Sequence, residues 1–224
     1  MAGTRQFPPL PDARTEVEQI AALWNGQSKR APGEEALVMA GGEATEDGLK
    51  RLVVGRQVVH LATHGFLDGG DGSLRSAANP LLSSGLALAG ANTCMRAASD
   101  CEGEDDGILL GEEILSLDLT GVDWVVLSAC STALGPILPR EGVHGLRRSF
   151  QGAGAATVIT TLWDVEDRTT RDWMKALYAA RLGGLSTAES MRQASLDLIA
   201  EARKKNRTLH PYYWGGFVAT GDWR

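Results

Sequence analysis

Three continuous apolar runs constrain the fold more than any other feature of this chain: VVHLA at 58–62, WVVLSA at 124–129 and TVIT at 157–160. Runs of this kind are typical of strands that are buried on both faces, as in a parallel sheet covered by helices. Stretches with helical periodicity lie between and after them, at 13–24, 44–55, 110–117, 141–154, 168–182 and 186–205. Further strands are predicted at 85–90 and 212–221. This alternation predicts an α/β fold with a mostly parallel central sheet flanked by helices.

Length and charge limit the classes of function. A chain of 224 residues can bury one full core, so we expect a single domain. The net charge of −6 and the absence of a basic stripe give no electrostatic reason to bind nucleic acid or an anionic membrane. The amino terminus lacks the apolar core of a signal peptide, and no apolar run reaches the roughly 18 residues of a membrane span. With only three cysteines, we expect a cytoplasmic protein without a disulfide framework.

The domain is expected to have three parts. Residues 1–34 hold the Pro-rich string FPPLPD and an amphipathic helix that Asp12 can cap, and they belong with the core at 35–224. Residues 92–107 lack periodicity, are acidic in their second half and predict an exposed, mobile insertion. Such a loop is a candidate for self-processing or for activator docking, and Arg96 is its only basic residue.

Two predicted strand ends carry residues suited to catalysis. In an open α/β sheet, ligands bind beyond the carboxyl ends of the strands. The strand predicted over 57–65 ends in His64 and Gly65, and the strand predicted over 123–130 ends in Cys130. The side chains of His64 and Cys130 therefore meet if the two strands are parallel neighbours or near neighbours. A thiol has an ordinary pKa of about 8.5 and needs a base such as imidazole to become the attacking thiolate. The backbone N–H groups of Gly65 and Cys130 are oxyanion-hole candidates.

Each of these residues also has a structural interpretation. A strand-end cysteine is often a small buried hydrophobe, and His60, His144 and His210 are interpreted as structural. Cys94 and Cys101 lack a matching ligand pair for zinc. The acidic strings at 68–72 and 102–107 do not follow a calcium-loop pattern, and no phosphate-binding glycine motif occurs in the right context. We expect neither a metal ion nor a cofactor.

Several long strings resemble the CHAT domain, a caspase-like cysteine peptidase domain related to separase: VVHLATHGFLDG, NPLLSSGLALAGA, GEEILSLDLTGVDWVVLSACSTALG, EGVHGLRRSFQGAGAATVITTLWDVED and HPYYWGGFVATGD. The resemblance covers residues 10–224 and implies a three-layer caspase-haemoglobinase fold. It also implies a cysteine endopeptidase (a thiol protease) with His64 of the ATHG motif and Cys130 of the SAC motif as its catalytic dyad. Family members commonly occur in bacteria beside helical-repeat or sensor regions, including antiviral defence systems, so a regulatory protein or fused sensor is an expected partner.

The resemblance extends to the substrate pocket. In relatives, the loop that corresponds to LWDVEDRTTRDW lines the pocket for the residue on the amino side of the scissile bond. Asp164, Glu166 and Asp167 are therefore candidates for pairing a substrate Arg or Lys, and their alternative role is to favour the start of the next helix. Ser128 stands two residues before Cys130, where some relatives place a pocket residue. A catalytically silent interaction module and a thiol hydrolase of small substrates remain the alternative functions.

Overall fold

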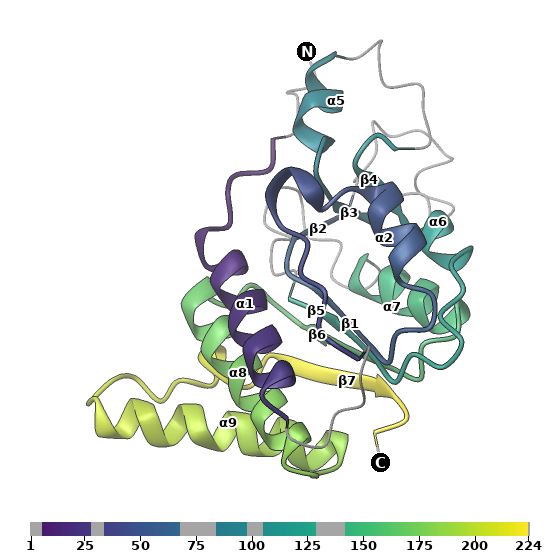
Figure 1. Cartoon of the computed structure of the whole chain (residues 1–224). Helices are drawn as coiled ribbons and strands as arrows, with labels where there is room; N and C mark the ends of the chain where they lie inside the picture. Colours follow the sequence, from purple (N-terminus) through teal and green to yellow (C-terminus); the bar gives the residue numbers. More distant parts are fainter. Residues whose placement is uncertain (1–5, 28–33, 68–83, 98–104, 129–141, 224) are drawn as a thin grey trace.

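A four-stranded sheet forms the centre of the molecule (Figure 1). The computed structural model describes residues 6–27, 34–67, 84–97, 105–128 and 142–223. In this sheet the strands follow the order β1 (Val58–Leu61), β5 (Trp124–Leu127), β6 (Thr157–Thr161) and β7 (Phe217–Gly221). β1 pairs with β5 and β5 with β6 in parallel, while β7 runs antiparallel at the edge. The carboxyl ends of the three parallel strands therefore share one edge.

A second, three-stranded sheet lies beyond that edge. It is antiparallel and contains β2 (His64–Leu67), β3 (Ser84–Ala87) and β4 (Ile108–Leu110), in that order. Only the two residues Ala62 and Thr63 separate β1 from β2. The bend at Thr63 is fixed by its hydroxyl, which donates a hydrogen bond to the carbonyl of Ala87.

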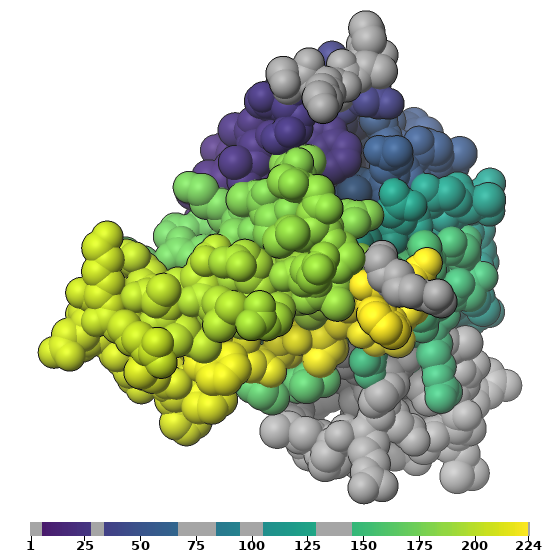
Figure 2. Space-filling model, turned by 90° about the horizontal axis from the view of Figure 1, so that it is seen from below, coloured from purple at the N-terminus to yellow at the C-terminus, as the bar shows by residue number. Residues whose placement is uncertain are grey.

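Helices cover both faces of the central sheet (Figure 1). One face packs on α1 (Pro11–Asn25), α8 (Asp167–Leu182) and α9 (Thr187–Lys204). The other packs on α2 (Glu46–Leu52), α6 (Gly111–Leu115) and α7 (Gly142–Gly152). α5 (Ala91–Ala97) and the short turns η1 (Gly41–Glu43) and η2 (Pro211–Tyr213) complete the elements. In Figure 2, α1 in purple borders α8 in green.

The alternation of side chains along β5 explains the two cores. Val125 and Leu127 point to the α7 side, where they pack with Phe150. Trp124 and Val126 point to the α8 side, where they pack with Trp173 and other buried residues of that helix. Successive side chains of a strand face opposite sides, so a continuous apolar run supplies both layers at once.

The predicted fold class is confirmed, since the molecule is α/β with a mostly parallel sheet flanked by helices. The single strand expected over 57–65 was wrong in one respect: it splits, and His64 opens a strand of the second sheet. The strand expected at 85–90 also belongs to that sheet, as β3. At α1, the cap is Leu10 and not Asp12, which lies inside the helix.

The stretch 92–107 is partly described. α5 spans Ala91–Ala97, and Cys94 takes part in a disulfide bond. The other two cysteines, Cys101 and Cys130, and most of the acidic half of this stretch lie outside the described residues. The division into 1–34 and 35–224 and the exposed insertion therefore stay predictions.

Candidate active site

His64 is the predicted catalytic residue that the structure places best. It is buried at the start of β2, and its Nε2 lies 2.6 Å from the carbonyl oxygen of Pro8. A carbonyl only accepts, so Nε2 must carry the hydrogen. In the neutral imidazole, Nδ1 is then the free acceptor. The backbone carbonyl of Pro8 thus selects the tautomer in which Nδ1 can act as a base.

The segment that carries Pro8 is anchored on both sides. The Phe7 ring packs on His64 and on Phe66, with ring centroids 5.6 Å apart in each pair. The side chain of Asn92 holds the backbone of Phe7 through two hydrogen bonds, accepting from its N–H and donating to its carbonyl, each at 2.8 Å. Asn92 belongs to α5, so residues far apart in the sequence fix the position of this histidine.

β5 leads toward the predicted nucleophile. The backbone N–H of Ser128 donates to the carbonyl of Leu61 at 2.9 Å, which extends the parallel pairing with β1 one residue past the strand. Ser128 is buried beside Ala62, two residues before His64. Cys130 lies outside the described residues, so the dyad itself stays a prediction. Gly65 lies in β2 opposite Leu86, and its role in an oxyanion hole is likewise untested.

A hollow of about 270 Å³, including its open side, brings two predicted pocket residues together. Ser128 directly follows β5, and Asp167 lies in the first turn of α8. Sequence reasoning missed the acidic residues that α1 contributes to the same hollow, Asp12 and Glu16. The remaining lining residues are Leu10, Ala13, Ala62 and Thr170.

The hollow has a strongly acidic character. Burial raises the pKa of Asp167 above its ordinary value, and the charges of Asp12 and Glu16 raise it further, while His64 acts in the opposite direction. Asp12 is paired with Arg171, whereas no hydrogen bond to the carboxylate of Asp167 occurs among the described residues. Crowded carboxylates in a partly buried site favour the binding of a cation.

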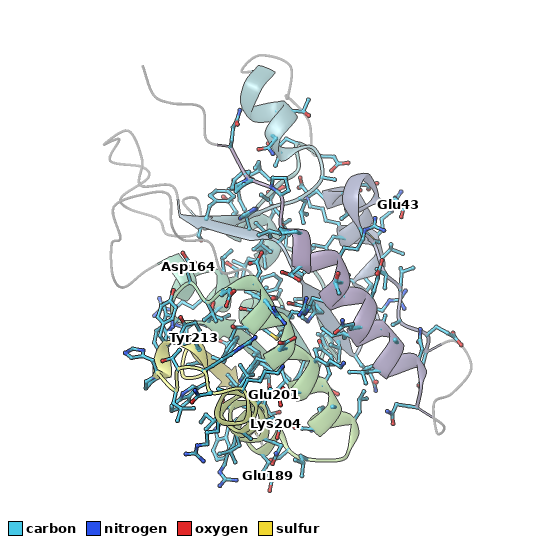
Figure 3. All side chains as sticks on the ribbon, turned by 90° about the vertical axis from the view of Figure 1, so that its left-hand side faces the viewer. Glu43, Asp164, Glu189, Glu201, Lys204 and Tyr213 are labelled. Atoms are coloured by element: carbon cyan, nitrogen blue, oxygen red, sulfur yellow. The ribbon has the colours of Figure 1, made fainter. Side chains whose placement is uncertain are left out.

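The other two predicted acidic residues do not line this hollow. Glu166 is the exposed cap residue of α8, makes no side-chain cap hydrogen bond, and accepts instead from the Thr169 hydroxyl at 3.2 Å. Asp164 lies in the connection from β6 to α8, and Figure 3 shows it above Tyr213 of η2. The structure therefore groups Asp167 with α1 and not with its neighbours in sequence.

The histidines interpreted as structural have different surroundings. His60 Nε2 lies 2.8 Å from Glu16 Oε1, and its Nδ1 lies 3.2 Å from the Tyr178 hydroxyl. His210 is exposed, and its Nδ1 accepts from the N–H of Tyr212 at the start of η2. The side chain of His144 lies outside the description. No helix among the described residues is both long and apolar enough to cross a membrane.

Comparisons with known proteins add to this geometry. The family model described as "CHAT domain" matches residues 1–222. Tetratricopeptide repeat protein 28 of Mus musculus is 26% identical over 96% of the chain, and that of Homo sapiens is 24% identical over 96%. The chain spans only 9% and 8% of the length of these relatives. A solved structure titled "Structure of Protease" is 16% identical, covers 54% of this chain and 31% of its own, and has a TM-score of 0.37.

Proposed function

The chain belongs to the CHAT domain family, and on that basis we propose that it is a cysteine endopeptidase with Cys130 as nucleophile and His64 as general base and acid. The observation that carries this proposal is the hydrogen bond from His64 Nε2 to the Pro8 carbonyl. It leaves Nδ1 as the basic nitrogen, at the sheet edge where β5 leads toward Cys130.

The proposed reaction uses this tautomer directly. Nδ1 of His64 accepts the thiol proton, and the Cys130 thiolate attacks the carbonyl carbon of the scissile peptide bond. The imidazolium keeps its Nε2–H bond to the Pro8 carbonyl and returns the proton from Nδ1 to the leaving amine, which leaves an acyl-enzyme. Water, deprotonated by His64, then releases the acid and regenerates the thiol. Gly65 and Cys130 are the proposed N–H donors to the oxyanion.

The proposed substrate is a protein with a basic residue on the amino side of the cleaved bond. Support comes from the acidic hollow, in which Asp167 and Ser128 lie beside Asp12 and Glu16. A substrate guanidinium or ammonium group relieves the repulsion that raises the pKa of Asp167. Asp164 and Glu166 are kept as proposed contacts on the substrate beyond this hollow.

The test is a map of cleavages in a diverse peptide library, read by mass spectrometry for the chain and for its Cys130→Ala and His64→Ala variants. Cuts that both variants lose support the peptidase, and an excess of Arg or Lys before the cut supports the acidic hollow. A second measurement is the rate of alkylation of Cys130 at neutral pH. No cuts above the variants, together with a Cys130 thiol that is alkylated just as fast after His64→Ala as before, refute the dyad and favour an interaction module.

A regulatory partner is the second part of the proposal. The matched relatives are named as tetratricopeptide repeat proteins, which supports control of the peptidase by a helical-repeat region or a separate protein. A role in bacterial defence or signalling rests on the family resemblance. The test is to measure peptide cleavage by the 224-residue chain alone. If the isolated chain cleaves at its full rate with no partner present, the proposal of a regulatory partner is contradicted.

A further inference from the structure

Three polar side chains, one lining the hollow and two behind it, take no part in the proposed chemical steps. Glu16 comes from α1, His60 from β1 and Tyr178 from α8. The side chain of His60 bridges the other two, with Nε2 at 2.8 Å from Glu16 Oε1 and Nδ1 at 3.2 Å from the Tyr178 hydroxyl. Glu16 and Tyr178 are only 3% and 1% exposed. These three elements are thus joined by polar contacts inside the layer between sheet and helices.

The chemistry of the groups fixes the direction of both hydrogen bonds. A carboxylate only accepts, so His60 Nε2–H donates to Glu16. In a neutral imidazole, Nδ1 then accepts from the Tyr178 hydroxyl. Burial raises the pKa of Tyr178, and the charge of Glu16 raises it further, so the phenol stays a donor. The rings of Trp124 and Tyr178 pack in a T-shaped arrangement, with their centroids 5.9 Å apart. This contact limits the movement of Tyr178.

This arrangement leaves Glu16 with one carboxylate oxygen for the hollow. Oε1 is taken by His60, and no partner for Oε2 occurs in the part of the chain that the structure describes. The hydroxyl of Thr170, which lines the same hollow, is buried and also lacks a partner among the described residues. Buried polar groups are nearly always paired, so the Thr170 hydroxyl beside this carboxylate points to a missing ligand.

The charges around the hollow single out Glu16. Asp12 is neutralised by Arg171, which also contacts Asp172. Glu16 contacts no Arg or Lys among the described residues, and its side chain is 4% exposed, against 30% for Asp12. A charge–charge contact strengthens as water is excluded. The carboxylate most able to discriminate a cation from a neutral group is therefore the most buried one.

We infer that Glu16 is a specificity-determining residue that binds the cationic side chain of the substrate, and that His60 and Tyr178 are positioning residues that hold its carboxylate. This inference rests on the proposed function, because it assigns the hollow to the substrate residue before the cleaved bond. A planar guanidinium with several N–H donors can satisfy both Glu16 and the Thr170 hydroxyl. An apolar side chain offers a hydrogen bond neither to Oε2 of Glu16 nor to the Thr170 hydroxyl.

The experiment measures binding, so that it does not depend on turnover. Two fluorescein-labelled peptides, Ala-Ala-Arg-Ala and its counterpart with citrulline, are titrated with the Cys130→Ala variant and followed by fluorescence anisotropy. Citrulline has nearly the shape of arginine without its charge. We expect the arginine peptide to bind about tenfold more tightly, since a charge-assisted hydrogen bond contributes at least that factor.

Further substitutions in the same background identify the residue responsible. Glu16→Gln should bring the two affinities within about twofold by weakening only the arginine peptide. Tyr178→Phe, which keeps the ring, should reduce the preference in part. The matched control is Glu18→Gln, which removes the same charge from the same helix at a side chain that is 56% exposed and paired with Arg14. This control should leave the preference unchanged.

An unchanged preference in Glu16→Gln, or an equal loss for both peptides, overturns the inference. If thermal unfolding shows that the Glu16→Gln variant is not folded, the Tyr178→Phe variant becomes the test. A folded Tyr178→Phe protein that keeps the full preference for the arginine peptide overturns the inference. Cleavage of the arginine peptide by the unsubstituted chain, lost in Cys130→Ala, tests the proposed function separately. A preference for arginine without any such cleavage keeps the cation site, and the proposed function is then decided by whether His64→Ala slows the alkylation of Cys130.

Discussion

Replacing Asn92 by alanine tests whether the amino-terminal segment prepares His64 for catalysis. Both hydrogen bonds of the Asn92 side chain go to the backbone of Phe7. At about 1 kcal/mol each, their loss weakens the docking of this segment by about 2 kcal/mol, or about 30-fold. Whenever the segment leaves, His64 loses the Pro8 carbonyl that selects its tautomer. We therefore expect slower reaction of Cys130.

The assay is the rate of alkylation of Cys130 by iodoacetamide under reducing conditions, with kcat/KM on a cleaved peptide as a second readout. A hydrogen bond to a charged imidazolium contributes about 1.5–3 kcal/mol, so both rates should fall by about tenfold or more in the undocked form. Averaged over docked and undocked molecules, neither rate can fall by more than about 30-fold, because the docking equilibrium itself changes by only that factor.

Two further variants serve as an intermediate case and as a control for this prediction. Asn92→Asp keeps the acceptor for the Phe7 N–H but loses the donor to its carbonyl, so its rates should lie between those of the other two forms. Thr93→Ala changes the next, exposed residue of α5 and should have no effect. Rates in Asn92→Ala that equal those of the unsubstituted chain refute the idea that the segment prepares His64.

Three predictions concern stability. Burial, together with Glu113, raises the pKa of Glu46 to about 7 despite its ion pair with Lys50. The folded state therefore keeps a proton that the unfolded state releases, and the free energy of unfolding falls by up to about 3 kcal/mol as the pH rises from 4.5 to 7. Urea unfolding at pH 5 and pH 8 should show that Glu46→Gln removes this fall, and equal pH dependence in both proteins contradicts it. Gly85→Ala places a methyl group 2.7 Å from the Phe66 ring and 2.9 Å from a carbonyl of β4, so thermal unfolding should show a loss of about 1–3 kcal/mol. Ser186→Ala breaks the capping box that Ser186 forms with Glu189 (labelled in Figure 3), and should cost α9 about 1 kcal/mol in chemical unfolding.

Periodicity was enough to predict the central layers. β1, β5 and β6 and the long helices α8 and α9 all fall within the ranges predicted from the sequence, give or take a residue at the helix ends. The strands are unbroken apolar runs, and the apolar residues of the helices recur at helical spacing. In both cases the local pattern agrees with the burial in the folded molecule. The neighbouring, parallel arrangement of β1 and β5 also follows the expectation that linked His64 to Cys130.

The second sheet could not be predicted in this way. VVHLATHG is one continuous string, yet the strand breaks after Leu61 because the Thr63 hydroxyl bonds to Ala87, which is 24 residues away. β4 has three residues and no pattern of its own. Its pairing with β3 is a long-range contact, which local reasoning does not contain.

The same limit explains why half of the acidic hollow was missed. On the sequence, Asp12 and Glu16 are ordinary polar positions of an amphipathic helix, and Asp12 even resembles a cap. Only the packing of α1 against α8 turns them toward Ser128 and Asp167.

The amino-terminal stretch therefore contributes to both halves of the candidate site. Pro8 fixes the tautomer of His64, and four residues after Asp12 the carboxylate of Glu16 reaches the hollow where we place the substrate cation. Burying a carboxylate costs more than packing an apolar residue, and Glu16, unlike the buried Glu46 with its Lys50, has no Lys or Arg partner among the described residues. The proposed recognition of a substrate cation would account for this burial, and one chain segment would then carry both the contact that orients His64 and a carboxylate of the proposed pocket.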